Sequence, residues 1–234
     1  MNNQRPPRGR HRLKRIDIIH EDRDLLVICK EPGLLTMSYH RDQDATVERM
    51  LTSYLRKGNS RSRVRAHTVH RLDRDTSGLL VVAKNAAIQQ TLKDNWKSVK
   101  KRYTAVIHGQ LDEKTGTFSS FLTENSKMVV HSTDNERQGK WAETRYRVIK
   151  ETQRFSLVDV NLLTGRKNQI RVHFAEAGHP VAGDHKYGKK GDRTKRMALH
   201  ARYLAFPHPF NGKPMEFESP VPDVILNLVG GVGT

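Results

Sequence analysis

The 234 residues carry 42 lysines and arginines against 25 aspartates and glutamates, a formal net charge of +17. This excess favours a polyanionic partner, and nucleic acid is the first candidate because its phosphates release counterions on binding. No apolar run approaches the roughly 20 residues of a membrane-spanning helix, no signal peptide is evident, and the single cysteine, Cys29, fits the reducing cytoplasm, where we expect the protein.

The chain begins with a basic segment and then turns apolar. Residues 1–15 hold six basic residues, two prolines and no acid, which predicts a disordered basic arm ahead of a folded domain over residues 16–234. Apolar runs at residues 16–20 and 25–30, separated by a charged turn, predict the two strands of a hairpin.

A helix and a basic loop come next. Apolar residues recur at helical spacing after Asp44, a candidate N-cap, until Gly58 ends the pattern. The loop that follows presents Arg61, Arg63 and Arg65 among glycine, asparagine and serine residues. Because these arginines cannot pack inward, we expect them to contact phosphates.

The most informative stretch is HRLDRDTSGLLVVAK, residues 70–84. Its polar half carries two carboxylates and two arginines, Asp73, Asp75, Arg71 and Arg74. A glycine and an apolar run follow, which predicts a buried strand. A polar turn at the end of a buried strand is a common place for reactive groups, although this stretch alone leaves an ordinary surface loop equally open.

Residues 85–162 predict one helix and then a series of strands. Asn85 can cap a helix that carries Ile88, Leu92 and Trp96 on one face. The predicted strands are residues 103–107, 117–122, 127–131, 141–149 and 155–162. Helical periodicity is missing from the later part, which favours an antiparallel portion of sheet.

A second informative stretch is LTGRKNQIRVHFAEAGHPVAGDHKYG, residues 163–188. Asn168 can cap a helix with an apolar stripe. Arg171 lies off that stripe, and Arg166 precedes the helix. Both arginines can therefore serve a site rather than the core.

The complete pattern indicates one α+β domain. Residues 197–206 predict a late strand, and a short helix could start at Pro222. Because no internal repeat and no Gly/Ser linker interrupts residues 16–234, we expect a single mixed, largely antiparallel sheet flanked by helices.

Several kinds of active site lack their motifs. Twelve histidines invite a metal, but there is no HExxH, no second cysteine and no carboxylate cluster at ligand spacing, so we expect none. Neither GxxxxGK[ST] nor GxGxxG occurs, so no nucleotide cofactor is expected. Ser77 lies in T-S-G-L and not in a G-x-S-x-G elbow, which argues against a serine hydrolase.

A carboxylate with arginines and a tyrosine remains. A carboxylate can act as a nucleophile or a base, and a nearby arginine stabilises its charged form. This set suits the breaking and remaking of a glycosidic bond, here within RNA because the protein is basic. A base in structured RNA must first be extruded, and Arg71 could fill the space that it leaves.

Several segments resemble the signatures of the RluA-type pseudouridine synthases: HRLDRDTSG, KRY at residues 101–103, GRKNQIRVH and GHPVAGDHKYG. LLVICKEPGLL is similar to the opening strand and turn of that family, and LHARYLAF to its late strand. The resemblance covers residues 16–220 in the family's order. It implies the pseudouridine synthase fold and the isomerisation of uridine to pseudouridine in RNA, with no cofactor. The extra N-terminal RNA-binding domain of many members is not expected, since only the arm precedes residue 16.

The resemblance also implies roles for individual residues. It makes Asp73 the catalytic aspartate, Tyr103 the tyrosine that packs against the target base, and Arg171 the basic partner of the aspartate. Leu199 would line the pocket, and Asp75 has no catalytic counterpart. We expect these residues to bind substrate: Arg71, Leu199, Arg166, Arg61, Arg63 and Arg65.

One departure from the family is Asn168, where many members have histidine. It lies outside the catalytic set and bears on loop packing or RNA contact. The expected partner is ribosomal or transfer RNA, and the expected oligomeric state is a monomer. Three routes stay open for Asp73: attack on uracil C6, attack on ribose C1′, or assistance in the loss of the 2′ proton. Two alternatives from other classes are a catalytically silent RNA-binding or RNA-folding protein and a base-exchange transglycosylase.

Overall fold

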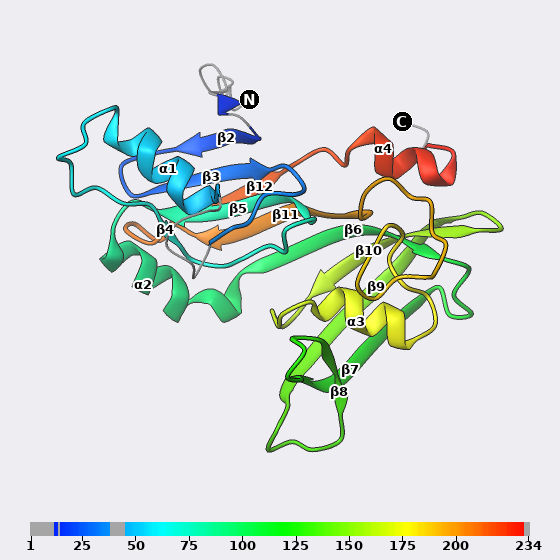
Figure 1. Cartoon of the computed structure of the whole chain (residues 1–234). Coiled ribbons are helices and arrows are strands. Elements are labelled where there is room, and N and C mark those ends of the chain that lie inside the picture. The colour runs from blue at the N-terminus through cyan, green and yellow to red at the C-terminus, as the bar shows by residue number, and fades with distance from the viewer. Residues whose placement is uncertain (1–11, 14, 38–44, 232–234) are drawn as a thin grey trace. The chain divides into compact units, whose positions relative to one another are not determined.

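The computed structural model describes residues 12–13, 15–37 and 45–231, and it has the α+β composition that the sequence predicts (Figure 1). By their contacts, these residues group into two compact units. One unit holds the described residues up to Trp96 together with residues 207–213, and the other holds the remaining described residues. Within the described ranges, no helix is long and apolar enough to cross a membrane.

The first unit is an antiparallel sheet with two helices. Its strands follow the order β1-β2-β3-β5, and β4 pairs with β5. The strands are β1 (Arg12–Leu13), β2 (Ile16–Glu21), β3 (Leu25–Lys30), β4 (His67–Thr68) and β5 (Ser77–Ala83). The helices are α1 (Val47–Arg56) and α2 (Ala86–Asp94), which a 3₁₀ turn, η1 (Trp96–Ser98), follows.

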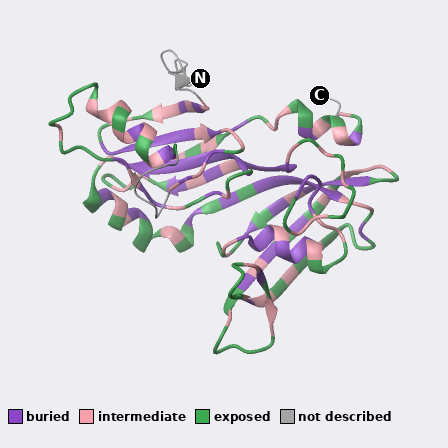
Figure 2. Cartoon of the chain, viewed as in Figure 1, coloured by how far each residue is buried: buried purple, intermediate pink, exposed green. Residues whose placement is uncertain are grey.

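Strand β5 is the most buried element of the first unit. All seven of its residues are buried, as predicted for the apolar run after the HRLDRDTSG motif (Figure 2). Its partner β3 is almost as buried, and the pairing aligns Ile28 with Leu80. The polar loop before β5 therefore leads directly into a buried strand that is paired with β3.

Of the predicted basic arm, residues 1–11 and 14 lie outside the described residues. Arg12 and Leu13 form β1, which pairs with β2, and Arg15 has a positive φ and donates a hydrogen bond to the Pro32 carbonyl.

The second unit is a larger antiparallel sheet. Its strands follow the order β12-β11-β6-β10-β9-β7-β8. They are β6 (Lys100–His108), β7 (Thr115–Glu124), β8 (Val130–Thr133), β9 (Lys140–Glu151), β10 (Phe155–Leu162), β11 (Leu199–Pro207) and β12 (Pro214–Glu218). The helices are α3 (Gln169–Glu176), α4 (Asp223–Leu226) and the 3₁₀ turn η2 (Asn227–Val229).

Helix α3 is fixed to the strands β7 and β9. Phe174 is fully buried and meets Phe118 of β7 edge to face, with ring centroids 5.2 Å apart. His173 lies between two hydroxyls, Thr144 Oγ1 at 2.9 Å and Ser120 Oγ at 3.1 Å. Apolar packing and buried hydrogen bonds together fix the axial position of this helix.

The helix caps agree with the sequence at one position and differ at another. Asn85 caps α2 as predicted, because its side chain accepts a hydrogen bond from the Ile88 amide. Asn168 occupies the N-cap position of α3 as predicted, but its side chain does not cap the helix. Asn168 is left-handed, with φ 53°, its side chain makes no capping bond, and the side-chain oxygen accepts a hydrogen bond from the Tyr187 hydroxyl instead. Asp44 lies outside the described residues, and the N-cap of α1 is Thr46.

A buried histidine gives this fold a pH dependence. His200 of β11 is 1% exposed, and burial, with the nearby charge of Arg196, lowers its pKa from 6.5 to about 4. Between pH 6.5 and about pH 4 the His200 side chain is protonated in the unfolded chain but neutral in the folded chain. The free energy of unfolding therefore decreases as the pH is lowered through this range.

We expect this histidine to reduce stability by about 2 kcal/mol between pH 7 and pH 5. Urea denaturation at the two pH values measures the loss, and His200→Gln should lose less than the wild-type protein. An equal loss in both proteins would contradict the assignment.

Candidate active site

The HRLDRDTSG motif forms a loop between β4 and β5, and we call residues 70–76 the Asp73 loop. Asp73 is half-buried, whereas Arg71, Arg74 and Asp75 are exposed. Leu72 and Thr76 are buried and fix the loop on either side of Asp73. The structure thus separates the two carboxylates that are equivalent by composition.

A buried threonine holds the residue before Asp73. Thr36, 2% exposed, donates its hydroxyl to the Leu72 carbonyl at 2.9 Å and accepts the Leu72 amide at 3.1 Å. One hydroxyl therefore satisfies both backbone groups of Leu72, which are otherwise cut off from water.

A buried lysine holds the residue after Asp73. The Lys30 side chain is fully buried, and its ammonium donates to the carbonyls of Arg74 at 2.9 Å, Leu34 at 2.9 Å and Glu31 at 3.0 Å. The Gly33 amide donates to the Arg74 carbonyl as well, at 2.7 Å. A side chain at Gly33 would strain its positive φ of 78° and meet the Arg15 guanidinium at 2.6 Å.

The loop is also closed on itself. The Thr76 amide donates to the Asp73 carbonyl at 3.2 Å. His70 accepts the Val81 amide through Nε2 at 3.1 Å, and its ring stacks on Trp96 with centroids 4.5 Å apart. The backbone on both sides of Asp73 is therefore fixed by hydrogen bonds.

In the second unit, two predicted pocket residues lie on neighbouring strands. Tyr103 of β6 is aligned with Ala201 of β11, and Leu199 lies two residues before Ala201 on the same strand. Side chains two residues apart share a face, so Leu199 is the diagonal neighbour of Tyr103. Both are buried, at 8% and 3% exposed.

Arg171 of α3 makes a bidentate ion pair with Asp184. Its Nε lies 2.7 Å from Asp184 Oδ2, and its Nη2 lies 2.8 Å from Oδ1. The Asp184 side chain is fully buried, and the Arg171 side chain is 11% exposed. The guanidinium also lies over the Tyr187 ring, 5.1 Å from its centroid.

Asp184 is held in its charged form. Burial raises the pKa of this carboxyl, but Arg171 and the backbone amides of Tyr187 and Lys186 outweigh burial, so the pKa lies below its ordinary value. The turn after Asp184 closes tightly, because a Cβ on Gly188 would lie 1.9 Å from the Asp184 carbonyl oxygen. The Asp184 carboxylate therefore holds the Arg171 guanidinium in place as a fixed, negatively charged partner.

The predicted catalytic residues belong to different units. Asp73 lies in the first unit, and Tyr103, Arg171 and Leu199 lie in the second. The pairing of Asp73 with Arg171 stays a prediction. Asp184 takes the Nε–Nη2 edge of the guanidinium, so a second carboxylate would use its other edge.

The remaining predicted substrate residues are mostly exposed. Arg71 lies on the Asp73 loop, and Arg61, Arg63 and Arg65 lie on the loop after α1. Arg166 precedes α3 and donates from Nε to the Trp141 carbonyl of β9 at 2.8 Å.

Sequence reasoning missed three supporting residues: Lys30, Thr36 and Asp184. Lys30 and Asp184 lie inside quoted motifs, LLVICKEPGLL and GHPVAGDHKYG, so the motifs offered a signal for them. Thr36 follows the first motif by one residue and carries no chemical mark in the sequence.

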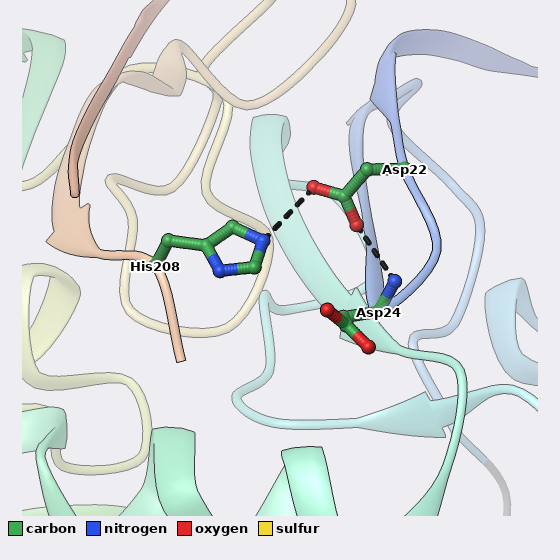
Figure 3. A group of neighbouring side chains, drawn as sticks. All are labelled: Asp22, Asp24 and His208. Atoms are coloured by element: carbon green, nitrogen blue, oxygen red, sulfur yellow. Dashed lines mark hydrogen bonds and ion pairs between the residues drawn. The ribbon is translucent and has the colours of Figure 1, made fainter. Parts of the chain in front are cut away.

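Among the described residues, one group has the donor atoms of a metal site: Asp22, Asp24 and His208. Asp22 Oδ1 accepts the backbone amides of Asp24 and Leu25, both at 2.8 Å, and Oδ2 faces His208 Nε2 at 3.2 Å (Figure 3). The Asp24 carboxylate pairs with Arg23. These contacts identify the group as a clasp between the β2–β3 turn and residues 207–213.

Comparison with known proteins gives the family of this chain. Residues 24–176 match the family model described as RNA pseudouridylate synthase. The RNA pseudouridine synthase YlyB of Bacillus subtilis is 38% identical over 218 residues, covering 92% of this chain and 72% of the relative. The ribosomal large subunit pseudouridine synthase D of Nitrosomonas europaea is 36% identical, covering 93% and 65%.

A solved structure gives the same result. The human RNA pseudouridylate synthase domain containing 1 superposes with a TM-score of 0.71 at 30% identity, covering 88% of this chain and 83% of that one. Fold and sequence together define an enzyme that modifies RNA. The chain belongs to the RNA pseudouridylate synthase family, which confirms the resemblance drawn from the motifs and makes the protein an isomerase.

We expect Thr36→Val to destabilise the protein and impair catalysis. Valine keeps the shape of threonine but leaves both buried backbone groups of Leu72 unpaired, at a cost of about 2 kcal/mol or more. Thermal unfolding and the rate of pseudouridine formation measure the two effects. Thr36→Ser keeps the hydroxyl and is the control; equal losses in both variants would contradict the role given to the hydroxyl.

We expect Asp184→Asn to cost about 3 kcal/mol of folding free energy, because it leaves the buried charge of Arg171 uncompensated. Asp159→Asn is the matched control, since its partner Arg202 is more exposed and the expected loss is about 1 kcal/mol. Chemical denaturation compares the two variants. Equal losses would show that burial of the Arg171 pair is not decisive.

Proposed function

We propose that this enzyme isomerises specific uridines in structured RNA with Asp73 as the catalytic nucleophile. The observation that supports it best is the setting of Asp73. It is a half-buried carboxylate in a loop whose backbone is fixed on both sides by Thr36 and Lys30. A nucleophile held in one position is worth more to a reaction than one that must be oriented in each turnover.

The proposed reaction breaks the bond between uracil N1 and ribose C1′ and forms a bond between C5 and C1′. The C5 proton leaves, N1 takes up a proton, and the product is an isomer of the substrate. Asp73 serves as nucleophile at C6 or at C1′, or assists loss of the 2′ proton. Each route uses the carboxylate form of Asp73, which a basic neighbour orients and stabilises.

Arg171 is the proposed neighbour. Its bidentate pair with Asp184 orients the guanidinium and keeps it from rotating. Presented by its other edge, Arg171 would pair with the Asp73 carboxylate and orient it. Tyr103 would pack against the target base, and Leu199, its diagonal neighbour, would line the same apolar wall.

The target base must leave the RNA stack before it can react. Arg71 lies two residues before Asp73, is exposed, and would occupy the space that the base vacates. Arg61, Arg63, Arg65 and Arg166 would bind the RNA backbone. In this proposal the protein acts as a monomer in the cytoplasm.

Ribosomal RNA is the first substrate to test. Relatives from Nitrosomonas europaea and Neisseria meningitidis, 36% and 37% identical, carry the name ribosomal large subunit pseudouridine synthase D. Transfer RNA is the second, because both are structured RNAs with uridines in accessible loops. Sequencing of pseudouridines in total RNA with and without the protein would identify the target.

We expect Asp73→Asn to abolish tritium release from RNA labelled at uridine C5, because an amide is neither a nucleophile nor a base. Asp75→Asn, two residues away and exposed, is the control and should retain most activity. RNA binding by fluorescence anisotropy should be the same for both variants.

Three outcomes of this experiment would separate the alternatives. Full activity in Asp73→Asn would contradict the assignment of the nucleophile. No release from the wild-type protein would indicate an RNA-binding or RNA-folding protein. Free uracil in place of a retained isomer would indicate a base-exchange transglycosylase.

A further inference from the structure

A groove of about 570 Å³ lies in the first unit, beside α1. One wall is the exposed side of α1, and the other is formed by residues 58–60 and Arg65 of the following loop. Every residue that lines it is polar or glycine: Thr46, Glu48, Arg49, Thr52, Ser53, Arg56, Gly58, Asn59, Ser60 and Arg65. Such a lining, with its guanidinium, hydroxyl and amide groups, suits a hydrated, charged ligand.

The helix wall follows from helical spacing. Arg49, Ser53 and Arg56 recur every three or four residues and form one stripe along α1. Val47 and Leu51 are the buried residues of the helix and lie off this stripe. Arg49 and Arg56 are seven residues apart, about 10.5 Å along the helix axis, so they can contact different phosphates of one strand.

The loop wall is tied to the same helix. Arg56 donates from Nε to the Val64 carbonyl at 3.0 Å, and the Ala66 amide donates to Thr52 Oγ1 at 3.0 Å. These two bonds lie on either side of Arg65 in the sequence. Arg65 is therefore held at the groove by its neighbours, and the groove is a built feature of the loop.

The charge of the groove is strongly positive. Three arginines line it against one acid, Glu48. The exposed residues Lys57, Arg61 and Arg63 extend the positive charge along the same loop. The serine, threonine and asparagine side chains between the arginines can donate hydrogen bonds to phosphate oxygens.

We propose that this groove binds the phosphate backbone of the substrate RNA, outside the target nucleotide. The inference rests on the proposed function and adds Arg49, Arg56, Thr52 and Ser53 to the RNA-binding surface. Arg65 lies eight positions before Asp73, and β4, paired with the buried β5, connects them. An RNA strand in the groove is thereby held by the segment that leads into the Asp73 loop.

The test is a double substitution, Arg49→Gln with Arg65→Gln, which leaves the Arg56 bond to Val64 intact. We expect binding of a fluorescein-labelled RNA hairpin to weaken roughly tenfold at low salt, and the slope of log K against log salt to become less steep by about 2. Because phosphates carry no sequence, the loss should be the same for hairpins of different sequence. In tritium-release assays the KM for RNA should rise.

The matched control is Lys93→Gln with Lys213→Gln, which removes the same charge from two exposed positions of the first unit outside the groove. If the groove variant binds RNA with the affinity and salt slope of this control, the inference is overturned. Circular dichroism and thermal unfolding confirm that both variants fold. Tritium release by the wild-type protein tests the proposed function separately, so the two failures are distinguishable.

Discussion

A buried ammonium group ties the Asp73 loop to the core of the first unit. Lys30 has no exposed surface, and an isolated charge in such a place would be very costly. Carbonyls of Glu31, Leu34 and Arg74 surround it, and the last of these belongs to the Asp73 loop. Any rearrangement that removes the loop deprives the ammonium of an acceptor. The cost of leaving the Lys30 ammonium without this acceptor thus stabilises the backbone conformation next to the proposed nucleophile.

The two units position their proposed catalytic side chains by different means. In the first unit, neutral backbone groups on either side of Asp73 are fixed by Thr36 and Lys30, and the carboxylate follows from the backbone. In the second unit, a helix carries Arg171, and a buried carboxylate fixes the guanidinium directly. The Asp184 pair is shielded from water, so dissolved salt screens it little. The hydrogen bonds of Thr36 and Lys30 fix a backbone segment, whereas the ion pair with Asp184 fixes a guanidinium group.

Much of this architecture can be predicted from the sequence, because periodicity and punctuation are local signals. The β2–β3 hairpin, the buried strand β5, the cap at Asn85 and the strand β10 are all found where the pattern places them. Asn168 is different, since a hydrogen bond from Tyr187, nineteen residues on, replaces the local cap. Thr36 was missed for the same reason, as its role depends on Leu72. Motifs mark Asp73 as the candidate nucleophile, but a contact between residues 36 positions apart explains how its loop is held.

The clasp at Asp22 has a consequence for the order in which the chain folds. His208 completes the first unit, yet it is 186 residues from Asp22 in the sequence. The β2–β3 hairpin can form as soon as its own residues are made, whereas the clasp must wait for nearly the whole chain. During synthesis the first unit therefore remains unfinished while the second is being made. The two units are each compact, but the folding of the first cannot be completed before the second has been synthesised.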